Sequence, residues 1–394
     1  MRTPAAERGR PAMSEHHHNV WIEVSRSAYA HNLSFFRQLV GPQVELAAVV
    51  KSNAYGHGVE QIAPLATTAD SFCVHALEEA LKLREAGFSR DILILGPVPI
   101  EDLERVAEHD LRVALFTRES AERLAEIARR RQHPVRVHLK LETGTHRQGI
   151  EASKLDGFAD LLRDNPLLMP EGLYTHFANI EDTTDHHYAE HQLATFHRMI
   201  EQLRAAGIDP PKRHAACSAA TLVVPKTHFN MVRLGISQYG MWSSKETYLS
   251  YRLEQPKADA TLLPVLTWKT RITQLKQVPA GAFVGYGCAY QTTRSTRIAI
   301  LPIGYADGYD RRLSNQAYVL IHGRRAPVRG RICMNLSMVD VTDIPDAVLG
   351  DEVVLLGRQG DQSIAAEHLA SLAGTIHYEI LTRINWDLPR LLVD

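Results

Sequence analysis

The stretch of sequence that decides the fold is LAAVVKSNAYGHG, residues 46–58. Its first half is a short apolar run, which is typical of a strand that is buried in a parallel sheet. The run ends at Lys51, and a loop with two glycines, a tyrosine and a histidine follows it. Burial lowers the pKa of a lysine and makes its amine a nucleophile toward an aldehyde. The alternative is a lysine whose ammonium reaches solvent at the strand end.

Similar apolar runs recur along the chain, and segments with helical periodicity separate them. We expect helices at residues 76–86, 120–131 and 187–206. About eight strand–helix units of this kind predict an α/β fold, with an N-terminal (β/α)8 TIM barrel over residues 20–254. Strands are expected at residues 45–51, 71–75, 92–95, 112–116, 135–141 and 172–176, with weaker candidates near His214 and at 231–234.

After Pro256 the pattern changes to short β segments separated by glycine and proline turns. We place the domain boundary near residue 254, because residues 243–260 are polar and lack clear periodicity. Residues 255–394 are then a C-terminal, mainly β domain, and residues 1–19 are a flexible N-terminal tail. The expected β strands are at residues 265–275, 296–301, 317–321, 326–328 and 352–356.

Composition excludes several classes of protein. The 394 residues carry a net charge of -1 with both signs interspersed, which argues against nucleic acid or an anionic membrane as a partner. No run of apolar residues is long enough to span a membrane. The four cysteines lie far apart without a C-x-x-C pair, which favours reduced thiols, a cytoplasmic location and no zinc site. Residues 16–18 are histidines that suit a solvated tail better than a metal site, so no metal is expected.

The segment around Lys51 resembles the cofactor-lysine segment of the alanine racemase family, which are fold type III enzymes of pyridoxal 5'-phosphate. Further matches follow in the same order from Trp21 to Pro389. The resemblance implies that Lys51 is the Schiff-base lysine, and that Tyr286 faces it from the β domain of the other subunit of a homodimer. Racemisation removes the α-proton from one face and returns a proton to the other, so it needs two bases. Lys51 and Tyr286 would be these bases, and alanine is the expected substrate.

The resemblance also implies how the cofactor is held. Arg233 matches the arginine that donates to the pyridine nitrogen, and His214 matches the histidine that holds this arginine. A permanent guanidinium charge disfavours a protonated ring nitrogen, weakens the cofactor as an electron sink and should suppress transamination. His176 would sit against Arg233 and help Tyr286 to ionise. The residues that match the phosphate site are Tyr55, Ser218, Gly235, Ile236 and Tyr378.

Other matches concern the substrate. Arg147 matches the arginine that approaches the cofactor's phenolic oxygen and the substrate carboxylate. Lys140 matches a lysine that can be carbamylated and then orients Arg147, although an ordinary ion pair with Glu142 is an equal alternative. Met334 would offer its backbone amide to the substrate carboxylate from the second subunit. The residues that match the entrance corridor are Tyr305, at its inner gate, Asp307 and Arg311.

Three residues depart from the family pattern. Cys217 stands where asparagine is usual, Asn335 replaces a usual aspartate, and Glu181 replaces a shorter aspartate. These departures leave open a broad-specificity or serine racemase on the same scaffold. Arg233 argues against a barrel-type decarboxylase, and the β domain argues against a non-catalytic cofactor-binding protein. With alanine as substrate, the implied role is D-alanine supply for peptidoglycan, and D-amino-acid catabolism is the alternative.

Overall fold

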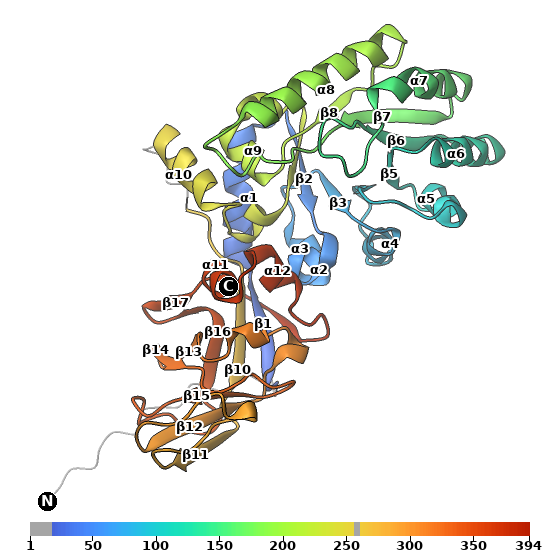
Figure 1. Ribbon diagram of the computed structural model, residues 1–394. Coiled ribbons are helices and arrows are strands. Elements are labelled where there is room, and N and C mark those ends of the chain that lie inside the picture. The colour runs from blue at the N-terminus through green and yellow to red at the C-terminus, as the bar shows by residue number, and fades with distance from the viewer. Residues whose placement is uncertain (1–17, 256–260) are drawn as a thin grey trace, which may run out of the picture. The chain divides into compact units, whose positions relative to one another are not determined.

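The computed structural model describes residues 18–255 and 261–394, which form two compact units (Figure 1). The larger unit contains Glu23–Leu266, Ile376–Trp386 and Arg390–Asp394. The smaller unit contains Thr267–Thr375, Asp387–Pro389 and the described residues up to Ile22. Most of the predicted tail at 1–19 lies outside the described residues, and so do His16, His17 and the end of the polar segment 243–260.

Eight parallel strands form the centre of the larger unit, and they confirm the predicted barrel. Their order in the sheet is β8-β7-β6-β5-β4-β3-β2-β9. The sheet nearly closes on itself, because the amide of Arg233 in β9 donates over 3.0 Å to the carbonyl of Ala216, just after β8. The strands are β2 (Glu45–Val49), β3 (Ser71–Val74), β4 (Asp91–Ile94), β5 (Arg112–Leu115), β6 (Val135–Lys140), β7 (Leu168–Tyr174), β8 (Lys212–His214) and β9 (Met231–Leu234).

Helices connect these strands and lie around their outside (Figure 1). Their inner faces are apolar, as in α6, where Ala121, Leu124, Ala125 and Ala128 are buried at helical spacing. The helices expected at residues 76–86, 120–131 and 187–206 are confirmed as α4, α6 and α8. The barrel helices are α1 (Arg26–Val40), α3 (Val59–Leu65), α4 (Leu77–Glu85), α5 (Leu103–Glu108), α6 (Arg118–Arg131), α7 (Leu155–Asp164), α8 (His187–Ala205) and α9 (Ser218–Val223).

The larger unit extends past the boundary expected near residue 254. Within the polar segment lies a helix that the sequence pattern does not predict, α10 (Lys245–Glu254), whose periodicity is weak because few of its residues are buried. The ring of Tyr251 in α10 packs edge-on against the ring of Phe35 in α1, with 6.1 Å between the centroids. Beyond α10, Asn32 of α1 accepts from the amide of Leu263 at 2.9 Å and donates to its carbonyl at 2.8 Å. These contacts keep the chain on the barrel until the smaller unit begins.

The smaller unit is mainly β, as predicted. One sheet has the order β14-β13-β16-β10-β1 with β17 paired to β16, and a second has the order β11-β12-β15. The prediction of one strand over residues 265–275 is wrong. The amide of Ile272 donates to the carbonyl of Asp351 beside the first sheet, whereas the amide of Thr273 donates to the carbonyl of Ile300 in the second. The chain therefore passes from one sheet to the other between these two residues. The strands are β1 (Val20–Ser25), β10 (Leu266–Arg271), β11 (Gln274–Val278), β12 (Thr296–Leu301), β13 (Tyr318–Ile321), β14 (Arg324–Pro327), β15 (Ser337–Asp340), β16 (Glu352–Gln359) and β17 (Gln362–Ile364).

The C-terminal part of the chain does not all belong to this β unit. Helix α11 (Ala366–Ala373) is part of the smaller unit, whereas α12 (His377–Thr382) and β18 (Arg390–Val393) are part of the larger one. The chain therefore contributes to both units in its C-terminal part, with α12 and β18 of the larger unit following the β strands of the smaller one in the sequence.

Three further features concern the described residues as a whole. The four cysteines are free thiols, in agreement with their spacing. No helix within residues 18–255 and 261–394 has the length and apolar character needed to cross a bilayer. In the same residues, no group of three or more histidine, cysteine, aspartate or glutamate side chains is arranged to hold a metal ion.

We expect Asn32→Ala to lower the free energy of unfolding by about 2–4 kcal/mol, because it removes three hydrogen bonds of a buried side chain and leaves the amide and carbonyl of Leu263 and the carbonyl of Gln238 without this partner. Urea unfolding followed by circular dichroism measures this difference. The exposed neighbour Ser34 on the same helix provides the control, since Ser34→Ala should change the stability by less than about 0.5 kcal/mol. Equal effects of the two variants would contradict the assignment.

Candidate functional site

A cavity of about 630 Å³ opens at the carboxyl ends of the barrel strands, where barrel enzymes place their active sites. Its volume suits a small-molecule ligand or cofactor. Four basic side chains, two of them arginines, and one carboxylate line it, so the cavity favours an anionic ligand. These charged residues are Lys51, Lys140, Arg147, Arg233 and Glu181. The other residues named above that line the cavity are Tyr55, His176, Cys217, Ser218, Gly235, Ile236 and Tyr378.

Lys51 enters the cavity from an unusual backbone turn. Strand β2 ends at Val49, two residues before the expected end, and Lys51 begins the short segment α2 (Lys51–Tyr55). Residues 52–55 all have φ of 52–54°, so they form one turn of left-handed helix, which costs about 1–2 kcal/mol for each residue. Glu79 of α4 holds the turn, because its carboxylate accepts from the amide of Ser52 at 2.5 Å and from that of His75 at 2.7 Å. The surrounding structure therefore maintains a strained turn beside the candidate nucleophile.

The pKa of Lys51 is lowered by its burial in the cavity and by the charge of Arg147. The lowered pKa raises the fraction of neutral amine at neutral pH, and only the neutral amine attacks a carbonyl carbon. The geometry of this residue thus agrees with the sequence-based hypothesis of a nucleophilic lysine.

Two tyrosines and a serine converge around Gly235. Ser218, the first residue of α9, accepts at its Oγ from the amides of Gly235 at 2.9 Å and Ser237 at 3.3 Å, which leaves its own hydroxyl hydrogen to be donated. The rings of Tyr55 and Tyr378 lie 6.3 Å apart between centroids. A Cβ atom at Gly235 would lie 2.8 Å from the hydroxyl of Tyr55, so the glycine keeps this space open. Burial raises the pKa of both tyrosines, which keeps their hydroxyls as donors for an anion.

Arg233 of β9 is 5% exposed and is fixed by three acceptors. Its NH1 lies 2.6 Å from Nδ1 of His214, and its NH2 donates to the carbonyls of Thr175 at 2.9 Å and Ala215 at 3.2 Å. The ring of Tyr174 stacks on that of His214 with a centroid distance of 4.7 Å. The structure therefore brings Arg233 and His214 together, as the sequence analysis expected.

Three further cavity residues come from β6 and β7 and the loops after them: Lys140 ends β6, Arg147 follows β6, and His176 follows β7. Burial and the charge of Arg233 lower the pKa of His176 to about 3, so this imidazole is neutral. Burial and the charge of Arg147 lower the pKa of Lys140 to about 8. The carboxylate of Glu142 accepts from the amide of Gly144 at 2.6 Å, whereas Nζ of Lys140 lies 3.3 Å from Oε1 of Gln148. An ordinary ion pair between Lys140 and Glu142 is therefore not what the structure shows.

The remaining expected site residues lie in the smaller unit and do not line this cavity. Tyr286 lies in the 3-10 turn Tyr286–Cys288, and its side chain is 72% exposed. Met334 and Tyr305 are also exposed, and Asp307 accepts from the amide of Gly304 at 2.9 Å. Arg311 begins the next 3-10 turn. Nothing within one unit brings these residues to Lys51, so their shared role stays a prediction.

The three departures from the family pattern are divided between the units. Cys217 and Glu181 line the cavity, whereas Asn335 is an exposed residue of the smaller unit. Burial raises the pKa of the Cys217 thiol to about 11, so it remains protonated. Cavity residues that the sequence analysis did not select are Val49, Ser52, His75, Leu95, Gln148, Tyr174, Ser243 and Thr382. His75 and Leu95 end predicted strands and Tyr174 lies inside one, and a place near a strand's carboxyl end is the signal that points to them.

Comparisons with known proteins match nearly the whole chain. The family model described as alanine racemase, N-terminal domain, matches residues 24–242, and that described as alanine racemase, C-terminal domain, matches residues 265–392. An alanine racemase from Carboxydothermus hydrogenoformans is 42% identical over 95% of this chain and 99% of its own length. The crystal structure of alanine racemase from Bacillus anthracis with bound L-Ala-P superposes with a TM-score of 0.88, at 36% identity over 97% of this chain and 96% of that one. A histidine racemase from Leuconostoc mesenteroides has a TM-score of 0.85, at 28% identity over 96% of this chain and 99% of that one.

We expect Gly56→Ala to destabilise the chain by about 2–5 kcal/mol, because a Cβ atom there would lie 2.1 Å from the carbonyl oxygen of Leu381 and because φ is +84°. Gly87 is the matched control, since its φ is +86° and nothing lies within 4 Å of an added Cβ. Gly87→Ala should therefore cost only about 1–2 kcal/mol. Chemical denaturation of both variants measures the difference, and equal losses would show that the Leu381 contact is unimportant.

Proposed function

Because the chain belongs to the alanine racemase family, we propose that it interconverts L-alanine and D-alanine with pyridoxal 5'-phosphate as its cofactor. As a member of this family it is an isomerase that acts on an amino acid. One observation carries the proposal. In a single cavity, a lysine with a lowered pKa, a cradle of hydroxyl donors and a buried arginine converge.

The residues of the cavity fit the functional groups of this cofactor. Lys51 would bond the aldehyde carbon, and Arg233 would donate to the pyridine nitrogen. The space that Gly235 leaves open, with hydroxyl donors around it, suits a phosphate group. The residues proposed to hold the phosphate are Tyr55, Ser218, Gly235, Ile236 and Tyr378, and those proposed to contact the ring are Arg147, His176 and Arg233.

When bound, pyridoxal 5'-phosphate withdraws electrons from the Cα atom of an amino acid and so acidifies its Cα–H bond. Lys51 would exchange the proton on one face, since its lowered pKa provides neutral amine. Tyr286 would exchange the proton on the opposite face. Its phenol is exposed in its own unit, which leaves it available to a second subunit. We therefore propose a homodimer with shared sites, in which the amide of Met334 also binds the substrate carboxylate.

Lys140 and Arg147 would orient that carboxylate. The pKa of about 8 makes a larger fraction of the Lys140 amine neutral than the ordinary pKa of a lysine does, and a neutral amine is the form that reacts with carbon dioxide. A carbamate at Lys140 would be an anion beside Arg147 and would fix its planar donor fork. Tyr305, Asp307 and Arg311 would form the entrance, where a narrow gate admits small side chains. D-alanine made in this way would supply peptidoglycan synthesis.

A second candidate is a racemase of broader specificity. Cys217 and Glu181, which line the cavity, depart from the family pattern, and a histidine racemase shares the fold. A pocket discriminates each methylene by only about 1–3 kcal/mol, so small changes in its lining alter the choice of substrate.

The first test of this function follows α-proton exchange and chirality in heavy water, with pyridoxal 5'-phosphate and single L-amino acids. We expect inversion of alanine, and loss of at least about 10³-fold in rate in Lys51→Ala, because both the cofactor bond and one base are removed. Comparable inversion of serine or larger amino acids would move the assignment to the second candidate. Absence of exchange with every amino acid would refute both.

We expect Tyr286→Phe to slow racemisation by about 10²–10⁴-fold, because one of two acid–base groups is lost. Exchange of the α-proton should continue for the enantiomer whose hydrogen faces Lys51, since that base remains. Tyr290→Phe, in the same unit, is the control that keeps both bases. Sedimentation at low concentration tests the homodimer in parallel, and an active monomer would contradict the shared site.

A further inference from the structure

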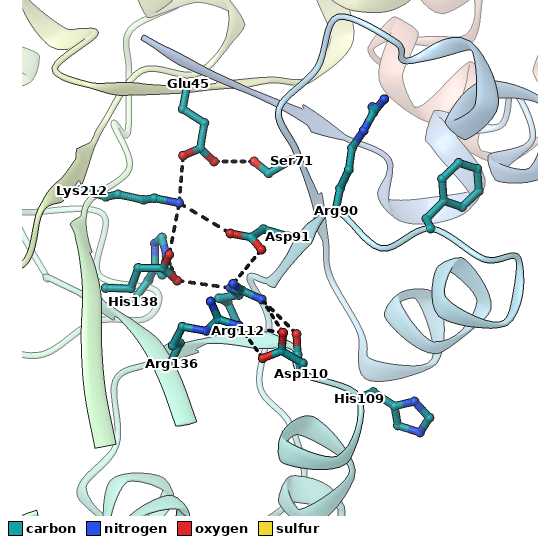
Figure 2. Close-up of polar contacts among 12 residues, drawn as sticks. Glu45, Ser71, Arg90, Asp91, His109, Asp110, Arg112, Arg136, His138 and Lys212 are labelled. Atoms are coloured by element: carbon teal, nitrogen blue, oxygen red, sulfur yellow. Dashed lines mark hydrogen bonds and ion pairs between the residues drawn. The ribbon is translucent and has the colours of Figure 1, made fainter. Parts of the chain in front are cut away.

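The opposite end of the barrel holds a partly buried group of charges that the proposed function does not use. We call Glu45, Asp91, Arg112, Glu171 and Lys212 the basal cluster. Glu45, Asp91, Arg112 and Lys212 are the first residues of β2, β4, β5 and β8 (Figure 2), and Glu171 lies in the middle of β7. Nζ of Lys212 lies 2.9 Å from Glu45, 3.3 Å from Glu171 and 3.8 Å from Asp91. Arg112, which is 3% exposed, lies 2.6 Å from Asp91 and 3.2 Å from Glu171. Cations and carboxylates thus alternate through the cluster.

A line of buried side chains joins the basal cluster to Arg233 in the cavity. Nε2 of His138, on β6, lies 3.8 Å from Oε2 of Glu171, which is an electrostatic contact longer than an ordinary hydrogen bond. Nδ1 of His138 lies 2.8 Å from Nε2 of His214. Nδ1 of His214 lies 2.6 Å from NH1 of Arg233. The line therefore runs through the barrel interior from a carboxylate at one end to a guanidinium at the other.

The two ends of this line determine the tautomer of both histidines. A guanidinium only donates, so Nδ1 of His214 must accept and its hydrogen must be on Nε2. That hydrogen is donated to Nδ1 of His138, which places the hydrogen of His138 on Nε2, toward the carboxylate of Glu171. With the opposite tautomer, Nδ1 of His214 would carry a hydrogen and face an N–H of Arg233, so two donors would meet. Burial lowers the pKa of both histidines, so both are neutral, and the contact with His138 together with Lys212 and Arg112 lowers the pKa of Glu171.

The backbone is adapted to this line at two points. Strand β7 is irregular where it pairs with β6, because Val137 pairs with Pro170 and His138 pairs with Gly172, which leaves Glu171 as the extra residue of a bulge. A bulge redirects a side chain, and here the side chain is that of Glu171. A Cβ atom at Gly172 would lie 2.5 Å from Nδ1 of His138, so the glycine provides the space for the imidazole.

We propose that His138 and Glu171 are positioning residues, which act through His214 to hold Arg233 in the orientation that the cofactor's pyridine nitrogen requires. This inference deepens the proposed function and rests on it. With the line intact, His214 is a fixed acceptor, and the guanidinium of Arg233 keeps its free N–H groups directed to the ring. Loss of the acceptor at His138 leaves the buried Nε2–H of His214 without a partner, and the imidazole then turns or changes tautomer and releases Arg233.

The first measurement is nitrogen NMR of the wild-type protein labelled with ¹⁵N-histidine, with and without pyridoxal 5'-phosphate. We expect both His138 and His214 to show the neutral tautomer with hydrogen on Nε2 and neither to titrate between about pH 6 and pH 9. Hydrogen on Nδ1 of either residue, or titration in this range, would overturn the proposal. This result does not depend on activity, so it remains decisive even if racemisation itself is not found.

The second measurement compares His138→Leu with His138→Gln in the holoenzyme. Leucine removes the acceptor, so we expect the single tautomer of His214 to be lost and the ratio of transamination to racemisation of alanine to rise at least about tenfold, because Arg233 no longer opposes ring protonation. The carbonyl of glutamine can accept from His214, so His138→Gln should stay within about threefold of wild type in this ratio.

Arg136→Gln is the matched control, since Arg136 bonds Asp110 at the edge of the same charged region but is not part of the line (Figure 2). It should leave the His214 tautomer and the reaction ratio unchanged. An unaltered His214 spectrum and ratio in a folded His138→Leu protein would overturn the proposal, since a residue that only fills space would behave in this way. If the leucine variant does not fold, the wild-type tautomers and the glutamine variant still decide the question.

Discussion

The eight strands of the barrel run in the same direction, and this one constraint determines where the chemistry of the larger unit lies. Parallel strands in a barrel bring all their carboxyl ends to one rim, however far apart they are in the sequence. The cavity is therefore assembled from residues at the ends of different strands, and the charged basal cluster occupies the other rim. The residues that meet in this way at the cavity are Lys51, Lys140, His176, Ser218 and Arg233.

Burial in the cavity favours neutral side chains around two permanent cations, Arg147 and Arg233. Burial lowers the pKa of Lys51 and Lys140 and raises that of Tyr55 and Tyr378, so amines tend to lose charge and phenols keep their hydrogen. Arg233 is different, because a guanidinium stays protonated in proteins. Its charge therefore stays in place, in an orientation fixed by His214, and burial and this charge together lower the pKa of His176 and His214 beside it.

Much of this architecture could be predicted from the sequence, because buried parallel strands leave continuous apolar runs. The eight strands and three of the helices were found in this way, and the resemblance around Lys51 indicated the cavity residues. The left-handed turn after Val49 could not be found, because residues 52–55 contain no glycine and a tertiary contact from Glu79 holds them. The change of sheet at Ile272 left no signal either, since both halves of the segment are strands.

The sequence pattern also does not predict which side chains of different strands contact one another. His138 lies in a predicted strand, but nothing in its spacing indicates that it meets His214, because strand neighbours in a barrel are set by the sheet order. The same limit applies to Tyr286, whose partner surface belongs to another part of the assembly in the proposed function. Residue types along one strand can be predicted, whereas contacts between strands need the three-dimensional structure.

The C-terminal segment belongs to the larger unit, and this affects when the ligand pocket can be completed during synthesis of the protein. Tyr378 and Leu381, which lie beside Tyr55 and Gly56, come from α12 near the end of the chain. During synthesis the N-terminal strands leave the ribosome first, and domains generally fold as they emerge. The ligand pocket therefore stays incomplete until α12 has left the ribosome, so the barrel strands and the β strands β10–β17 are synthesised before the first binding of any ligand that needs Tyr378.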